Sequence, residues 1–129
     1  TLHRGDFLFA EYRGKPRILH ILAYGTAEWI EGRPFATGSG DLFAYALLQK
    51  YQELELGLTM AEVLAYKTVE EAIQVASFGL GPPIDIWEIT EKGHKKLEPE
   101  DIAKLDDVAH TVRQAELQVF QARAPGKTE

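Results

Sequence analysis

The residues of this sequence with the clearest chemical potential form a turn at Gly38, Ser39 and Gly40. The turn follows a short extended stretch and precedes a predicted helix, so free backbone N–H groups and the positive end of the helix dipole converge on it. Such a turn can cradle an anion. The alternative is a purely structural turn in which glycine relieves steric limits, and the adjacent carboxylate of Asp41 disfavours a phosphate.

The spacing of the histidines gives little indication of a metal site or of a catalytic role. None of them is spaced from a carboxylate in a way that a helix or strand would turn into a metal site, so no metal is expected. His20 lies within an apolar strand pattern, and we expect it to be hydrogen-bonded and partly buried rather than a catalytic base. The four histidines are His3, His20, His94 and His110.

Two pairs of adjacent acidic residues, Glu70–Glu71 and Asp106–Asp107, lie on predicted helices. Consecutive helical side chains point in different directions, which favours solvated helix faces over a shared acid/base site. The glycine-rich stretch 79–83 lacks the preceding strand and following helix of a dinucleotide-binding motif and is predicted to be a connector. We therefore expect no cofactor.

The first third of the chain is predicted to be β-rich. Two short apolar runs at 7–12 and 17–24 flank a turn signal at 13–16 and predict a hairpin. Further extended pieces at 27–32 and 34–37 would complete a small antiparallel sheet.

The middle of the chain changes to a helical period. Apolar residues predict a helix over about 41–54, and Thr59 with Glu62 forms a capping box that begins a second helix. That helix would run to Ser77, with the alternative of a break near 66–68, where a similar capping pattern recurs.

The last third combines one strand with one helix. Alternation over 84–90 predicts a strand that buries Ile84, Ile86 and Ile89, followed by a turn at 92–94. Pro99 suits the first position of a helix, whose apolar stripe extends from Ile102 to Val119. This stripe favours core packing, with a subunit contact as the alternative.

Composition limits the classes of function. The chain has 129 residues, and its 14 basic and 20 acidic residues give a formal net charge of -6, which disfavours a nucleic-acid partner. The absence of cysteine favours a cytoplasmic location. No apolar run reaches the roughly 20 residues of a membrane span, so no membrane partner is expected. We expect a single α+β domain over 1–122, complete or partial, and a disordered tail over 123–129.

Several motifs occur in an order and spacing that together resemble one family. The stretch from Phe7 to about Leu97 resembles the second half of a proteasome-type subunit of the N-terminal nucleophile hydrolases. The motifs are the paired strands Phe7–Ala10 and Pro16–Ile21 around a Gly-Lys turn, the Ala-x-Gly-Ser-Gly and Tyr-Ala passage within 34–48, Leu58–Thr59, the helix segment 69–73, and the strand segment 83–90.

This resemblance implies a fold and a site. The fold is an antiparallel sheet with flanking helices, similar to the C-terminal half of an αββα sandwich. The implied chemistry is peptide-bond hydrolysis by an N-terminal threonine whose own amine serves as base, assisted by a lysine and an acidic residue of the earlier half. Ser39 matches a supporting serine that hydrogen-bonds near that amine. Thr1 stands first here, but residues 2–6 do not resemble the family's nucleophile strand.

Two departures from the family pattern leave the activity open. The family carries an aspartate and then a serine in the loop before residue 84, and here those positions hold Ser77 and Leu80. The first hypothesis is a threonine-type peptidase whose missing N-terminal half carries the nucleophile and whose full-length form assembles into a homo-oligomer. The missing half or self-association would cover the open sheet face. The second is a non-catalytic scaffold subunit, and the third is an unrelated small binding domain.

Overall fold

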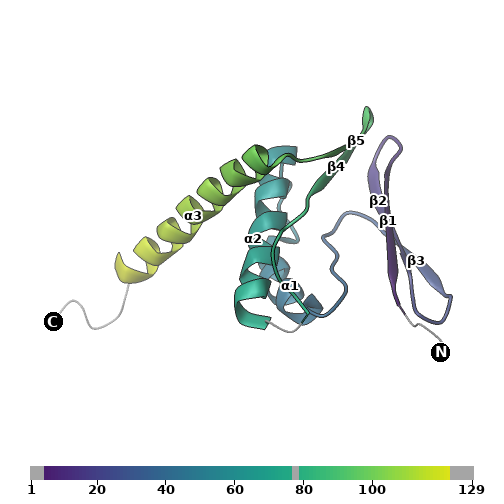
Figure 1. Cartoon of the computed structure of the whole chain (residues 1–129), viewed down its shortest axis with the longest axis horizontal. Helices are drawn as coiled ribbons and strands as arrows, with labels where there is room; N and C mark the ends of the chain where they lie inside the picture. The colour runs from purple at the N-terminus through teal and green to yellow at the C-terminus, as the bar shows by residue number, and fades with distance from the viewer. Residues whose placement is uncertain (1–4, 77–78, 123–129) are drawn as a thin grey trace.

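The computed structural model describes residues 5–76 and 79–122 and shows an α+β arrangement of small antiparallel sheets with flanking helices (Figure 1). The first sheet has the order β1 (Phe7–Tyr12), β2 (Pro16–Ile21) and β3 (Ala27–Ile30). The predicted hairpin is confirmed, with Gly14 at φ +72° in its turn. The tail at 123–129 lies outside the described residues.

The extended piece predicted at 34–37 is not a strand. Gly32, at φ +69°, turns the chain after β3, and Pro34 has no N–H to donate to a ladder. The segment instead runs from the sheet toward the helices (Figure 1).

The helix predicted over 41–54 is shorter than expected. It consists of α1 (Asp41–Leu48) and a 3₁₀ turn, η1 (Gln49–Tyr51). Leu54 N–H then donates to the Tyr51 carbonyl at 3.1 Å, a tighter turn than an α-helix would make. This tightening redirects the chain, and Leu54 lines a groove between the helices and the first sheet.

Helix α2 (Leu58–Ala76) is continuous, so the alternative of a break near 66–68 is wrong. The Thr68 hydroxyl donates to the Leu64 carbonyl at 2.7 Å, which satisfies this polar group inside the helix instead of capping a new one. The helix begins one residue before Thr59, which therefore lies in its first turn.

The second sheet pairs β4 (Trp87–Thr90) with β5 (Gly93–Lys96) and lies beside β1 (Figure 1). The strand predicted over 84–90 is thus shorter, and the turn comes one residue earlier than predicted. Gly93, at φ +119°, already pairs with Thr90.

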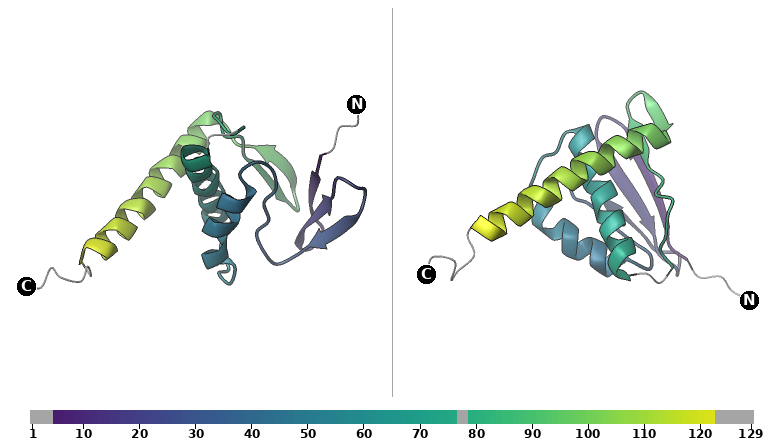
Figure 2. Two further views of the ribbon diagram at one scale, coloured as in Figure 1. Left: turned by 90° about the horizontal axis from the view of Figure 1, so that it is seen from below. Right: turned by 60° about the vertical axis from the view of Figure 1, so that its left-hand side comes forward.

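The long helix α3 (Pro99–Ala122) begins at the predicted proline and crosses α2 (Figure 2). Within the described ranges, no helix is both long enough and apolar enough to cross a membrane. The core lies where α2, α3 and the residues around the second sheet meet. It consists of Val63, Tyr66, Leu97, Leu105 and Ala109, with Ile84, Ile86 and Ile102 packed against it.

The first half of the α3 stripe is therefore buried, as core packing predicts. Its second half is open, since Leu117, Val119 and Phe120 are exposed, and the alternative of a subunit contact stays open there. Ile89 is also largely exposed, contrary to the burial expected of it.

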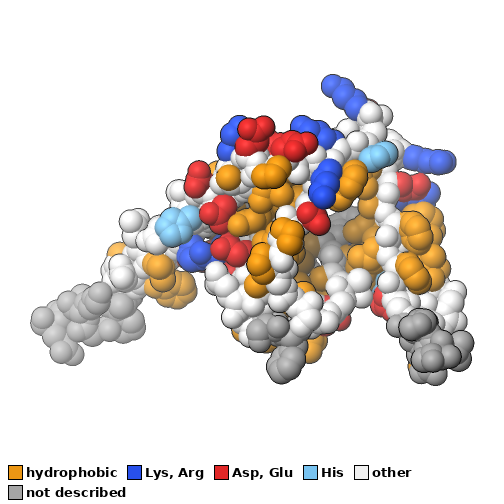
Figure 3. All heavy atoms as spheres, in the orientation of Figure 1, with side chains coloured by type: hydrophobic (Ala, Val, Ile, Leu, Met, Phe, Trp, Pro, Cys, Tyr) orange, Lys and Arg blue, Asp and Glu red, His pale blue; other side chains and the backbone are white. Residues whose placement is uncertain are grey.

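The two faces of the first sheet differ in their surroundings. Ile18 and Ile30, a register pair, face a groove of about 520 Å³ that the helices border on the other side. The opposite face is open to solvent, with exposed fractions of 60% for Phe7, 55% for Phe9 and 50% for Trp29. Figure 3 shows hydrophobic side chains gathered over this sheet and a hollow between it and the helices.

Replacement of Leu105 by alanine tests the location of the core. Leu105 is 5% exposed in the α2–α3 core, so Leu105→Ala should lower the free energy of unfolding by about 2–5 kcal/mol. The matched control is Leu117→Ala on the same helix, 50% exposed, which should change it by no more than about 0.5 kcal/mol. Urea denaturation measures both, and equal losses would contradict this core.

Candidate functional site

The Gly-Ser-Gly turn opens α1. Gly38 has φ +105°, a conformation that favours glycine, and its carbonyl accepts a hydrogen bond from the Asp41 N–H at 3.1 Å. Gly40 is the N-cap residue and makes no side-chain cap, while its carbonyl accepts from the Ala44 N–H at 3.0 Å. Ser39 is exposed between the two glycines. The turn therefore places the exposed Ser39 at the start of a helix.

The loop after α2 packs directly against this turn. A Cβ at Gly79 would lie 3.1 Å from Ser39 Oγ. A Cβ at Gly40 would lie 2.6 Å from Leu80 Cδ1 and 3.6 Å from Ala72 Cβ. The structure thus brings together the turn, the end of α2 and the loop where the resemblance places catalytic groups.

The groups in that loop are not those of the family pattern. Leu80 approaches the turn with an apolar side chain, which neither donates nor accepts a hydrogen bond. Ser77 lies outside the described residues, as does Thr1. Among the residues that are described, none forms a hydrogen bond with the Ser39 hydroxyl. The role of Gly38 and Gly40 in anion binding stays a prediction.

A second polar cluster, around His20, is more extensive than the sequence indicated. His20 is 6% exposed, and its ring nitrogens contact Asp6 Oδ2 at 2.8 Å through Nε2 and Glu28 Oε1 at 3.1 Å through Nδ1. The Thr37 hydroxyl donates to the same Asp6 oxygen at 3.2 Å. The expected hydrogen-bonded, buried histidine is confirmed. The strand register pairs His20 with Glu28, but no local pattern pointed to Asp6.

The partners of His20 shift its protonation. The hydrogen bond to Asp6, followed by the one to Glu28, raises the pKa of His20 above its ordinary value. The same hydrogen bond from His20 is the largest cause that lowers the pKa of Asp6. The cluster thus favours a charged imidazolium flanked by carboxylates.

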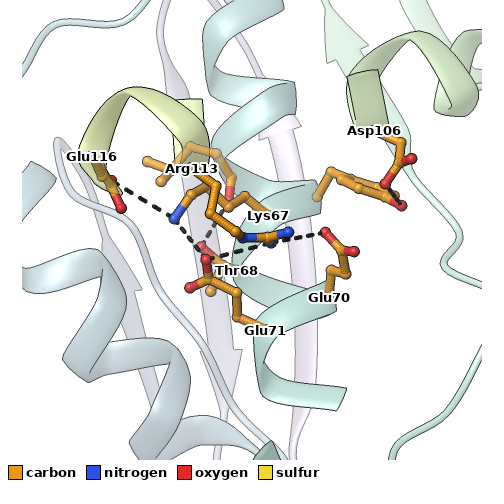
Figure 4. Close-up of polar contacts among 9 residues, drawn as sticks. Lys67, Thr68, Glu70, Glu71, Asp106, Arg113 and Glu116 are labelled. Carbon is orange, nitrogen blue, oxygen red and sulfur yellow. Dashed lines mark hydrogen bonds and ion pairs between the residues drawn. The ribbon is translucent and has the colours of Figure 1, made fainter. Parts of the chain in front are cut away.

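A charged network joins α2 to α3 (Figure 4). The Lys67 ammonium, with a side chain only 7% exposed, donates to Glu71 Oε1 at 2.7 Å and lies 4.0 Å from Glu116 Oε1. Arg113 Nη2 lies 3.4 Å from Glu70 Oε2 and 3.6 Å from Glu71 Oε1. The buried lysine is therefore paired, as its burial requires.

The prediction of solvated faces is wrong for Glu70 and Glu71, which are half-buried, whereas Asp106 and Asp107 are exposed as expected. Glu70 and Glu71 contact Arg113, and Asp106 accepts a hydrogen bond from the Tyr66 hydroxyl at 2.8 Å. Burial raises the pKa of Tyr66 to about 12, with Asp106 adding to the shift. Crossing of the helices turns these side chains toward each other, which a single helix pattern does not reveal. Their contacts hold α2 and α3 together and have a structural role.

One carboxyl group at the other end of α2 has a strongly shifted pKa. Burial raises the pKa of Glu62 to about 7, and the hydrogen bond and like charge of Glu88 add to the shift. Asp101 raises it further, while Lys95 opposes the shift. Glu62 lies ten residues before Ala72, or about 15 Å along the helix, so it does not belong to the Ser39 turn.

The remaining histidines do not assemble a centre. The His94 ring lies 5.8 Å from that of Trp87, His110 is exposed on α3, and His3 lies outside the described residues. In the part of the chain that the structure covers, no three histidine or acidic side chains gather in a way that could hold a metal ion.

Comparison with known proteins gives one informative similarity. Over 93 residues the chain is 37% identical to "Proteasome subunit beta 1" of Thermococcus gammatolerans, and the match covers 72% of this chain and 45% of that relative. No protein-family model matches the chain, and no solved structure matches it significantly. The chain thus spans less than half the length of this relative.

The similarity supports a proteasome-type relationship. The α+β arrangement of small antiparallel sheets and flanking helices is consistent with a proteasome-like fold.

Replacement of Gly40 by alanine tests the packing of the turn. Its Cβ would crowd Leu80 Cδ1, so Gly40→Ala should lower the free energy of unfolding by about 1–3 kcal/mol relative to Gly57→Ala. Gly57 is a matched control, because a Cβ there meets nothing within 4 Å. Denaturant unfolding of both variants measures the difference, and its absence would show that the loop does not pack on the turn.

The pKa of Glu62 predicts a pH dependence of stability. Since the folded pKa of about 7 exceeds the ordinary 4.5, the stability that Glu62 contributes is complete below about pH 4.5 and is lost as the pH rises toward 7. Glu62→Gln, which cannot ionise, should therefore gain stability over the wild type as the pH rises from 4.5 to 7. The control is Glu91→Gln in the exposed β4–β5 turn.

Denaturant midpoints measured across this pH range compare the three proteins. A constant difference between Glu62→Gln and the wild type, or the same trend in the control, would contradict the shift.

Proposed function

We propose that this chain is the later half of a proteasome-like subunit and supplies a supporting residue, Ser39, to a threonine-type peptidase site. The observation that carries the proposal is the geometry of the turn. Ser39 is exposed at the start of α1, packed by Gly79, with a hydroxyl that no described residue engages. Its similarity to a proteasome beta subunit, over less than half of that subunit, supports the assignment.

The proposed chemistry divides between this chain and the missing half. An N-terminal threonine hydroxyl attacks the peptide carbonyl, and its own amine accepts the hydroxyl proton. The Ser39 hydroxyl hydrogen-bonds near that amine and orients it. Ser39 therefore positions the base and does not itself attack, consistent with the lack of a described base beside it.

Assembly is part of the proposal. The exposed Phe7, Phe9 and Trp29 form an apolar sheet face of a kind that monomers rarely leave open, and the groove behind the sheet is unfilled by described residues. The earlier half of the subunit, together with self-association into a cytoplasmic homo-oligomer, would cover these surfaces. Peptides would be the substrate.

A second candidate function is a non-catalytic scaffold subunit. It is favoured by Leu80, which places an apolar side chain against the turn where the family pattern has a serine. The family's aspartate position holds Ser77. In this alternative the fold and the assembly remain while the hydrolysis is lost.

Intact mass and N-terminal sequencing of the purified protein separate the candidates. A mass well above 14.5 kDa with an upstream segment that begins with threonine supports the peptidase. An upstream segment without a threonine, lysine and acidic residue at family spacing supports the scaffold. A mass equal to that of this chain, beginning at Thr1, would contradict the peptidase, because the nucleophile half would be absent, and would favour a scaffold fragment or an independent binding domain.

Replacement of Ser39 tests its supporting role directly. Ser39→Ala should reduce kcat/KM for a fluorogenic peptide by up to about 100-fold, because the base loses its orientation. Thr111→Ala is the control, since the Thr111 hydroxyl is exposed and bonds only locally to the Asp107 carbonyl. Unchanged activity in Ser39→Ala would remove Ser39 from the site.

A further inference from the structure

His20 is the centre of a cluster that ties four segments together. Its ring nitrogens contact Asp6, just before β1, at 2.8 Å and Glu28 in β3 at 3.1 Å. Asp6 also accepts from the Thr37 hydroxyl at 3.2 Å, and the Phe35 ring lies 4.8 Å from the His20 ring. Both Phe35 and Thr37 belong to the segment that leads into the Ser39 turn.

The contacts of His20 identify its protonation state. A neutral imidazole carries one N–H and can donate to only one of the two carboxylates. Its other nitrogen would then present a lone pair to a carboxylate oxygen at hydrogen-bonding distance. Only the imidazolium donates to Asp6 and Glu28 together, so this geometry favours the charged form.

Two sets of contacts connect the His20 cluster to the Ser39 turn. Thr37 precedes Ser39 by two residues and is held by Asp6. Phe35 lies between the His20 ring and the Tyr45 ring of α1, whose centroid is 6.0 Å away. The segment 35–37 is therefore anchored at both ends, and Figure 1 shows it crossing from the sheet to the helices.

We propose that the His20 imidazolium is a positioning group for the Ser39 turn. While charged, it holds Asp6 and Glu28, and through Thr37 and Phe35 it orders residues 35–41. On loss of the proton, one of the carboxylate contacts becomes unfavourable, the segment loosens, and the turn loses its fixed position. The benefit to catalysis rests on the proposed function, whereas the pH-dependent ordering does not.

The groups around His20 set the direction of the pH dependence. Asp6 faces it from the segment before β1 and Glu28 from β3, while Phe35 and Thr37 bring no charge. Within residues 5–76 and 79–122, the cation that contacts this set is Arg33, whose guanidinium lies 5.7 Å from the centre of the Phe35 ring. The two hydrogen-bonded carboxylates raise the pKa of His20. Ordering is therefore complete below about pH 6.5 and is lost as the pH rises through the raised value.

Hydrogen–deuterium exchange followed by mass spectrometry tests this proposal on the purified protein. Peptides that cover 34–44 are followed from about pH 6 to 9, with rates corrected by an unstructured reference peptide. In the wild type, corrected exchange should rise severalfold in a one-proton transition with a midpoint above about 6.5, the ordinary histidine value. Exchange in α3 should stay constant.

Two variants test whether the pH transition in exchange is due to His20. His20→Gln should exchange at the high-pH level throughout, whereas His110→Gln, altered at an exposed histidine of α3, should behave as the wild type. Absence of the transition in the wild type, or its persistence in His20→Gln, overturns the proposal.

A milder variant keeps the test decisive if His20→Gln does not fold. Glu28→Gln retains His20 but removes one negative partner, so the midpoint should move to lower pH. The control is Glu31→Gln, whose carboxylate pairs with Lys15 instead. An unmoved midpoint in Glu28→Gln overturns the proposal.

A separate activity measurement distinguishes the two claims. If the protein cleaves peptides, the transition seen by exchange should reappear as a loss of kcat at high pH. If it cleaves none, the proposed function fails while the exchange data still decide the role of His20 in ordering the turn.

Discussion

The close approach of Leu80 and Ala72 to Gly40 is the contact on which the candidate site depends. It fastens the start of α1 to the end of α2 and to the loop that follows, so that Ser39 lies beside Gly79. A side chain at residue 40 would push these segments apart. Because three separate segments meet there, packing helps to determine the position of the Ser39 hydroxyl.

The two parts of the molecule differ in how far their apolar and charged side chains are buried or paired. Around α2, α3 and the second sheet, apolar side chains are buried and the charges of Lys67 and Arg113 are paired with carboxylates. The first sheet instead leaves one face open and the other over a groove, and the His20 cluster closes part of it.

Much of the fold could be predicted from the sequence, because its elements rest on local signals. The first hairpin, the start of α3 at Pro99 and the class of fold follow from apolar periodicity and from turn residues. The prediction of a strand at 34–37 was wrong because it followed the apolar pattern alone. Pro34 has no N–H to donate to a strand ladder. The continuous α2 follows the predicted helix, and the alternative of a break near 66–68 is wrong because Thr68 bonds to a carbonyl of its own helix.

The site was only partly predictable. The Ser39 turn is visible in the sequence because its glycines and the resemblance both point to it. The partnership of His20 with Asp6, and of Glu70 with Arg113, depends on how segments far apart in the chain are brought together. No spacing along one helix or strand contains that information.

The most direct test of the central claim is a high-resolution structure of the protein as purified and assembled, in which the distance from Ser39 Oγ to the nearest α-amino group is measured. A threonine amine within about 2.6–3.2 Å, the range of a hydrogen bond, is the result that the account predicts. An assembly in which no α-amino group comes within reach of Ser39 would contradict the account.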